Sequence, residues 1–127
     1  MDPDVATLLG MRTWAVVGLS NDRTRAAHGV AQFLQARGAR IVPVHPAGEA
    51  VHGEPGHRTL ADVPFPVDVV DCFVNSSRVG AVVDDAVAVG ARGVWMQLGV
   101  VDEAAAARAR AAGLVVVMDR CPKIEWP

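Results

Sequence analysis

The sequence has little of the chemistry that supports several common kinds of site. It contains two cysteines, four histidines and a single lysine, Lys123. Two cysteines exclude a disulfide framework and a four-cysteine zinc site, and the histidines lack the spacing of metal ligands on one helix face. The arginines are scattered and the net charge is −2. The chain therefore lacks the basic patch that nucleic acids or anionic membranes require.

Long hydrophobic runs are also missing. No apolar run approaches the roughly 20 residues of a spanning helix, and Asp2 and Asp4 stand where a secretory signal would carry lysine or arginine. We therefore expect a cytoplasmic protein. Its 127 residues, 51% of them hydrophobic, are enough for one domain with a genuine core. The prediction is a single domain over residues 1–127.

Valine-rich runs recur along the chain. Three of them follow a glycine that can end a helix: Gly38 precedes residues 40–44, Gly90 precedes residues 93–98, and Gly113 precedes residues 114–118. Two more runs cover residues 13–17 and 67–74. The runs show no regular alternation of apolar and polar residues, which is typical of strands covered on both faces of a parallel sheet.

Amphipathic segments separate these runs. We expect a helix over residues 26–37, a second helix capped by Ser76 or Ser77, and a third over residues 103–112 with Asp102 as its N-cap. Residues 46–66 form a surface excursion with a short helical turn. Strands alternating with helices through right-handed crossovers predict an α/β fold. Its core is a Rossmann-like doubly wound sheet of about five parallel strands, with helices on both faces.

The turn after the first strand is the most informative feature of the chain. Gly18 permits a tight exit, Ser20 offers a hydroxyl, and Arg23 and Arg25 supply positive charge just before a helix N-terminus. We interpret it as a phosphate cradle; the alternative is an ordinary strand-to-helix connection with two surface arginines. On the first interpretation, Gly18→Val should abolish ligand binding while the sheet stays folded.

Ligands of open parallel sheets bind outside the carboxyl ends of the strands. A nicotinamide-dinucleotide site would show G-x-G-x-x-G and an acidic residue after the second strand. This chain has Ser20 at the second glycine position and His45-Pro46 after the second strand. It also lacks the glycine-rich lysine loop of nucleoside-triphosphate hydrolases. The turn therefore favours the anionic part of another nucleotide.

Four segments carry a resemblance to a known family. They are Val16-Val17-Gly18-Leu19-Ser20, Ile41-Val42-Pro43-Val44-His45-Pro46, Val94-Trp95-Met96-Gln97-Leu98-Gly99-Val100 and Val117-Met118-Asp119-Arg120-Cys121-Pro122-Lys123-Ile124-Glu125. On these motifs the chain resembles the small CoA-binding proteins that are similar to the N-terminal domain of the succinyl-CoA ligase alpha subunit. The resemblance extends over residues 14–126, nearly the whole chain.

The resemblance implies CoA or acyl-CoA as the ligand and assigns roles to residues. The loop after the first strand would hold the diphosphate through Gly18, Ser20, Arg23 and Arg25. The end of the second strand would pack against adenine or ribose, and the later loops would contact the pantetheine arm. Those contacts implicate Val44, Pro46, Gln97 and Gly99, and the edge of the sheet adds His45 and Asn75 as candidate binding residues.

Two positions depart from the family's usual pattern. Relatives usually carry asparagine where this chain has His45, and often lysine where it has Ala47. The missing lysine leaves open how the 3′-phosphate of CoA would be held, although His45 or an arginine of the first loop could compensate.

The ligase relatives place their phosphorylated histidine in a second domain that this chain does not have. We therefore expect a non-catalytic CoA-binding protein that acts as a carrier, sensor or regulatory module, with an unknown protein partner. One alternative is an NAD(P)-linked small-molecule enzyme on a Rossmann-like fold. Another is thiol or persulfide chemistry at Cys121 on bound CoA. Trp95 lies within a covered strand and is more typical of core than of a ligand channel.

Overall fold

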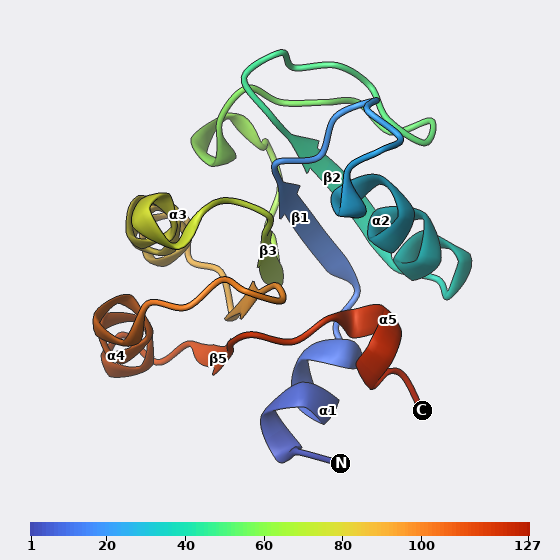
Figure 1. The fold of residues 1–127 in the computed structure, drawn as a ribbon. Coiled ribbons are helices and arrows are strands. Elements are labelled where there is room, and N and C mark those ends of the chain that lie inside the picture. The colour runs from blue at the N-terminus through green and yellow to red at the C-terminus, as the bar shows by residue number, and fades with distance from the viewer.

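The computed structural model describes residues 1–127, which fold as a layered α/β domain (Figure 1). The five strands are β1 (Thr13–Val17), β2 (Arg40–Val44), β3 (Val69–Cys72), β4 (Gly93–Met96) and β5 (Val115–Val117). The helices are α1 (Pro3–Leu9), α2 (Ala26–Ala36), α3 (Ser76–Ala88), α4 (Glu103–Ala111) and α5 (Pro122–Glu125), with one 3₁₀ turn, η1 (Leu60–Asp62).

All five strands are parallel and lie in the order β2-β1-β3-β4-β5. The chain moves outward from β1 to β2 and then returns past β1 to β3, so the direction of winding reverses between β1 and β3. The predicted doubly wound sheet of five parallel strands is confirmed. In such sheets the reversal point opens a crevice at the carboxyl ends of the strands.

Helices cover both faces of the sheet, as predicted (Figure 1). Side chains alternate between the faces: Ala15 packs in the cluster that includes α3 and α4, whereas Trp14 and Val16 pack in the cluster that includes α1 and α2. The small alanine and valine side chains of α4 and α3 suit a close helix–sheet approach. Both tryptophans of the sheet, Trp14 and Trp95, lie on the other face with ring centroids 5.7 Å apart. Trp95 is fully buried, so its assignment to the core is confirmed.

The structure confirms the predicted start or N-cap of two helices and corrects the predicted N-cap of a third. Helix α2 begins at Ala26, and Asp102 caps α4 by accepting from the Ala105 amide at 2.9 Å. Helix α3 is capped by the backbone of Asn75 instead of by a serine. The hydroxyl of Ser76 instead forms hydrogen bonds with Gly99 and Val101 in the loop after β4.

Two short helices were not predicted. Asp2 caps α1 through hydrogen bonds from the amides of Asp4 (2.8 Å) and Val5 (3.3 Å), and Pro3 supplies the fixed φ of a first helical residue. The single turn α5 follows β5 and begins at Pro122. Both lie on the α2 side of the sheet (Figure 1).

The segment between β2 and β3 is a surface excursion, as predicted, and it begins at the carboxyl edge of the sheet. It is held to β2 by hydrogen bonds from the His57 amide to the Pro43 carbonyl (2.9 Å) and from the His45 amide to the His57 carbonyl (3.0 Å). Its helical turn is η1, shorter than expected. None of the helices is long and apolar enough to cross a membrane.

Candidate functional site

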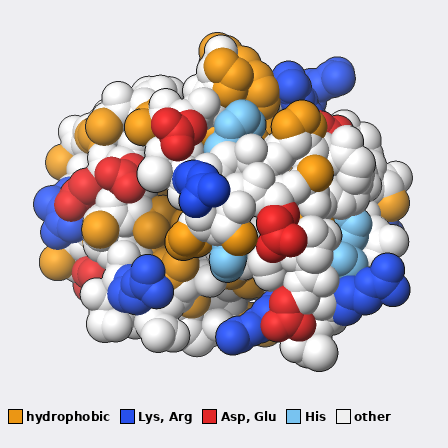
Figure 2. Space-filling model, turned by 90° about the horizontal axis from the view of Figure 1, so that it is seen from above, with side chains coloured by type: hydrophobic (Ala, Val, Ile, Leu, Met, Phe, Trp, Pro, Cys, Tyr) orange, Lys and Arg blue, Asp and Glu red, His pale blue; other side chains and the backbone are white.

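The candidate site lies at the carboxyl edge of the sheet, where five loops leave the strands. Figure 2 views the molecule onto this edge. Basic, acidic and histidine side chains are interspersed there, and no patch of one charge covers the surface (Figure 2). Recognition at this edge must therefore depend on individual groups rather than on a broad electrostatic field.

Gly18 ends β1 with φ +101, a conformation that favours glycine. A Cβ at this position would lie 2.5 Å from the carbonyl oxygen of Phe73, at the reversal point between β1 and β3. Gly18 is therefore needed for the contact between two strands as well as for the turn. The expectation that Gly18→Val would leave the sheet undisturbed is wrong, because the added side chain collides with backbone.

The loop from Gly18 to Arg25 leaves several backbone donors unused. The amides of Ser20, Asn21 and Arg23 donate no hydrogen bond within the chain, and neither do those of Ala26 and Ala27 in the first turn of α2. Free amides in a turn that leads into a helix N-terminus are the usual backbone donors for phosphate oxygens. This part of the predicted cradle therefore has the donors that a diphosphate would need.

The two arginines of the loop have different surroundings. Arg25 is the N-cap residue of α2 and pairs with Asp22 at 3.6 Å. Asp22 also accepts from the hydroxyl and the amide of Thr24, and these hydrogen bonds hold the pKa of its carboxyl below the ordinary value. Arg23 forms no ion pair and lines a hollow beside the loop. Arg23 is therefore the freer of the two cations.

That hollow has a volume of about 540 Å³ and an entirely polar lining. Its five lining residues come from the loop, from α2 and from the segment after β2: Asn21, Arg23, His28, Gln32 and His52. Asn21 closes one side by donating to the Ala50 carbonyl at 3.0 Å. Sequence reasoning missed His28, Gln32 and His52, although the four-residue spacing of His28 and Gln32 on one helix face was visible.

The residues after β2 are only partly available to a ligand. Val44 is buried in the core cluster beside Leu60, whereas Pro46 is exposed. Nδ1 of His45 accepts from the Ala47 amide at 3.1 Å, which shapes the turn. Of these three residues predicted to contact the ligand, Pro46 and His45 reach the surface of the carboxyl edge, whereas Val44 lies in the core beneath them.

The predicted residues on the β4 side are tied into the structure. The Gly99 amide donates to Asp119 Oδ1 at 2.7 Å. The Ser76 hydroxyl accepts from the Val101 amide at 2.9 Å and donates to the Gly99 carbonyl at 3.2 Å. Asn75 is exposed at the start of α3, and its side chain makes no cap hydrogen bond. Hydrogen bonds from Gly99 and Val101 therefore hold this loop to its neighbours, whereas the amides of Leu98 and Asp102 donate none within the chain.

Gln97 pairs with a buried carboxyl that sequence reasoning did not single out. Its Nε2 donates to Asp71 Oδ1 at 2.6 Å, and Oδ2 of Asp71 has no partner. Removal from water raises the pKa of the Asp71 carboxyl to about 8, and the Gln97 hydrogen bond lowers it by less. The available signal was an aspartate inside a valine-rich strand covered on both faces.

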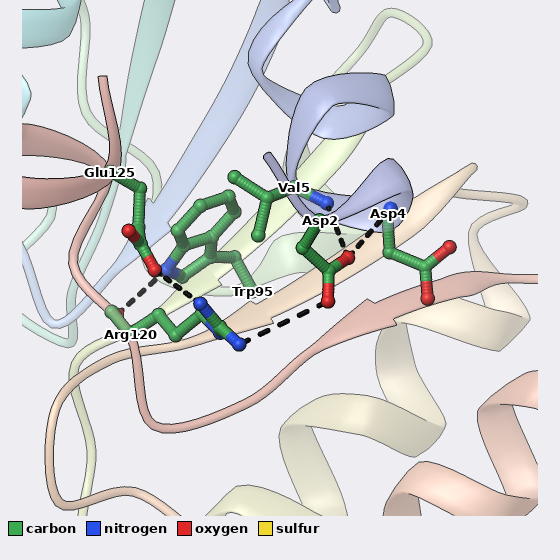
Figure 3. Close-up of polar contacts among 6 residues, drawn as sticks. All are labelled: Asp2, Asp4, Val5, Trp95, Arg120 and Glu125. Atoms are coloured by element: carbon green, nitrogen blue, oxygen red, sulfur yellow. Dashed lines mark hydrogen bonds and ion pairs between the residues drawn. The ribbon is translucent and has the colours of Figure 1, made fainter. Parts of the chain in front are cut away.

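The end of β5 is also locked internally. Arg120 pairs with Glu125 at 2.5 Å and with Asp2 at 3.9 Å, and its carbonyl accepts from Trp95 Nε1 at 2.8 Å (Figure 3). These contacts join the two ends of the chain and raise the pKa of the guanidinium, chiefly through Glu125. Cys121, the next residue, is 9% exposed. A thiol so covered is a poor nucleophile unless the chain moves.

Together these features define a class of protein: a doubly wound α/β domain whose reversal point carries a glycine turn, free amides and an unpaired arginine. The arrangement fits an anionic nucleotide, since a diphosphate needs such donors and a glycine for close approach. No group of three or more histidine, cysteine, aspartate or glutamate side chains is placed to hold a metal ion.

Comparison with known proteins identifies the family. Residues 12–127 match the model of the CoA binding domain family, so the chain belongs to that family. The uncharacterized protein YneT of Bacillus subtilis (strain 168) is 33% identical over 110 residues, which is 87% of this chain and 82% of YneT.

Solved structures share the fold. A hypothetical protein from Pyrococcus horikoshii OT3 is 32% identical with a TM-score of 0.92, and the match covers 98% of this chain and 89% of that chain. The dinucleotide-forming acetyl-coenzyme A synthetase 1 of Ca. Korarchaeum cryptofilum matches at 23% identity and a TM-score of 0.78. That match covers 91% of this chain and 28% of the synthetase. The second likeness shows that this fold also occurs as one part of a larger protein.

Proposed function

We propose that this protein binds CoA or an acyl-CoA at the carboxyl edge of its sheet and does not transform it. The observation that carries the proposal is the loop from Gly18 to Arg25, with its unused amides and the unpaired Arg23 beside a polar hollow. Membership in the CoA binding domain family supports CoA as the nucleotide. The diphosphate would lie on the loop amides and the adenosine beside Pro46.

The pantetheine arm would run toward the loop after β4. Gln97 is 4% exposed and is oriented by Asp71, so it offers a fixed amide edge beneath that route. Gly99 and Asn75 lie on the surface above it. Because this loop is already held by internal hydrogen bonds, it would act as a wall for the arm rather than as a grip.

The non-catalytic part of the proposal rests on the state of the nucleophiles. Both cysteines are unpaired thiols and both are buried. Burial raises the pKa of Cys72, and the nearby Asp71 raises it further, so its thiol stays protonated. Cys121 has no histidine or carboxylate hydrogen-bonded to its sulfur that could activate it. The protein would then act as a carrier, sensor or regulatory module for the nucleotide.

Calorimetric titration with CoA and NAD tests the binding claim. CoA should bind with an affinity that falls as salt concentration rises. NAD should bind much more weakly, because β2 ends in His45-Pro46 and not in the acidic residue that would accept its ribose hydroxyls. Preferential binding of NAD would favour a dinucleotide enzyme instead.

Incubation with acetyl-CoA and succinyl-CoA tests the absence of catalysis. Free thiol and protein mass are followed over time in the native protein and in Cys121→Ser. Neither thiol release nor a mass increase is expected. Turnover, or an acyl adduct that disappears in Cys121→Ser, would overturn the binding-only function.

A further inference from the structure

We infer that the hollow lined by Asn21, Arg23, His28, Gln32 and His52 binds a phosphate monoester, and that it holds the 3′-phosphate of CoA. This inference rests on the proposed function and adds to it a subsite for one particular group. The hollow adjoins the diphosphate loop, since Asn21 and Arg23 belong to both.

The lining has the composition of an anion site. It combines one guanidinium, two imidazoles and two carboxamides, and it contains no carboxylate. Guanidinium and imidazolium groups donate charge-assisted hydrogen bonds to phosphate oxygens, and carboxamides add neutral donors. The segment after β2 carries Ala47 and contains no lysine that could bind the phosphate. The histidines lie on the other side of the loop and offer imidazole nitrogens there.

The two histidines are held close together. Their ring centroids are 4.3 Å apart, and Nε2 of His52 lies 2.8 Å from the His28 carbonyl oxygen. A carbonyl oxygen only accepts, so Nε2 of His52 carries a proton and donates this hydrogen bond. Positive charge on both rings at this separation is unfavourable, and an anion beside the pair would relieve the repulsion.

Two hydrogen bonds to residues of helix α2 fix the position of His52. Its carbonyl accepts from Gln35 Nε2 at 3.0 Å, while its ring donates to His28. Its φ of +53 lies in the left-handed region, where a residue other than glycine is under strain. The two hydrogen bonds therefore hold His52 in an unfavourable backbone conformation, and its ring is already in position beside the hollow before a ligand binds.

The charges around His28 determine how the subsite responds to pH. Partial burial lowers the pKa of His28, and the positive charges of His52 and Arg23 lower it further, while Asp22 opposes them. The Glu49 carboxylate lies 3.4 Å from Asn21 Nδ2 at the margin of the hollow. A bound dianion would reverse this balance, since it favours the protonated imidazole. Binding of the monoester should therefore strengthen as pH falls toward the second pKa of phosphate, about 6.

Titration with CoA and with dephospho-CoA isolates this contribution, because the two ligands differ only in the 3′-phosphate. The native protein should bind CoA about tenfold or more tightly than dephospho-CoA at about pH 6.5, and the ratio should shrink at about pH 8.5. His28→Gln and His52→Asn should each reduce the ratio, mainly by weakening CoA. Asparagine is used at position 52 because it tolerates the left-handed backbone.

Arg110→Gln, which removes one exposed charge from the last turn of α4 on the other face of the sheet, is the matched control and should leave the ratio unchanged. Equal affinity for CoA and dephospho-CoA in the native protein would overturn the inference while the proposed function stands. Equal weakening of both ligands by His28→Gln would also overturn it, since the hollow would then hold the diphosphate. Binding of neither ligand would overturn the proposed function itself.

Discussion

The loops after β1 and β4 both join a parallel strand to a helix at the same edge, yet they use their polar groups differently. The β1 loop leaves the amides of Ser20, Asn21 and Arg23 without a partner in the chain. The β4 loop donates its Gly99 and Val101 amides to side chains of neighbouring segments. The β4 loop is thus tied to neighbouring segments through its amides, whereas the amides of residues 20–25 bond only within their own loop or not at all.

The arginines after β1 and after β5 differ in the same way. Arg23 faces a polar hollow, whereas Arg120 is committed to Asp2 and Glu125 (Figure 3). Residue type alone does not separate a binding arginine from a structural one; the contacts of each side chain must be known. Changes on the β4 and β5 side should therefore alter stability, and changes on the β1 side should alter binding.

The largest expected effect is at Asp71, on the structural side. Burial raises the pKa of its carboxyl from the ordinary 3.8 to about 8, so between these values the folded protein holds a proton that the unfolded chain has lost. Stability should fall by about 1.4 kcal/mol per pH unit between about pH 4 and pH 8 and level off above that. Asp71→Asn should remove this slope and raise stability at pH 7 by on the order of 3–4 kcal/mol. Urea unfolding across pH checks it, and a native-like slope in the variant would contradict it.

On the binding side, Arg23→Ala combined with Arg25→Ala should weaken CoA binding by on the order of 2–4 kcal/mol, because two charge-assisted contacts are lost. The melting temperature should hardly change, since the Asp22–Arg25 pair is exposed. Calorimetry measures the loss, and the double variant Arg12→Ala, Arg110→Ala is the control of equal charge. Unchanged affinity would place the phosphates elsewhere.

Ser76→Ala tests the frame of the β4 loop. It removes one hydrogen bond to Gly99 and one from Val101, so unfolding should become easier by about 1 kcal/mol. Affinity for CoA should fall less than in the arginine variant. A binding loss as large as that of the arginine variant would erase the distinction between the two loops.

Arg120→Gln should have the smallest effect. Its ion pairs are partly exposed, so the melting temperature should drop by only a few degrees. CoA binding should not change, because the side chain is turned toward α1 and α5 (Figure 3). Weaker CoA binding at unchanged stability would assign Arg120 to the ligand.

Most of the fold could be predicted from the sequence because strand and helix signals were local. Valine-rich runs after glycines marked the strands, and Asp102 marked the start of α4. The alternation of strands and helices indicated a parallel sheet with right-handed crossovers, but the particular order β2-β1-β3-β4-β5 was not predicted. Helix α5 escaped prediction because it is a single turn of four residues, and α1 because its cap, Asp2, was interpreted only as a charge near the N-terminus.

The site could be located but not resolved in detail. Gly18 and Arg23 were predicted as binding residues because a loop after the first strand has a known chemical use. The histidine pair was not, because His28 and His52 are 24 residues apart and meet only when the excursion after β2 packs on α2. The bond from Gln97 to Asp71 was hidden for the same reason, since it links neighbouring strands far apart in the sequence.

Amide chemical-shift mapping during titration with CoA tests the central claim most directly, because it reports on both loops in one experiment. We predict the largest shifts in residues 18–28 and around His52, with smaller shifts in residues 97–101. The small hollow at the opposite edge, lined in part by Leu9, Met11 and Trp126, should be silent. Largest shifts in that opposite hollow, or no shift anywhere at saturating CoA, would contradict the account.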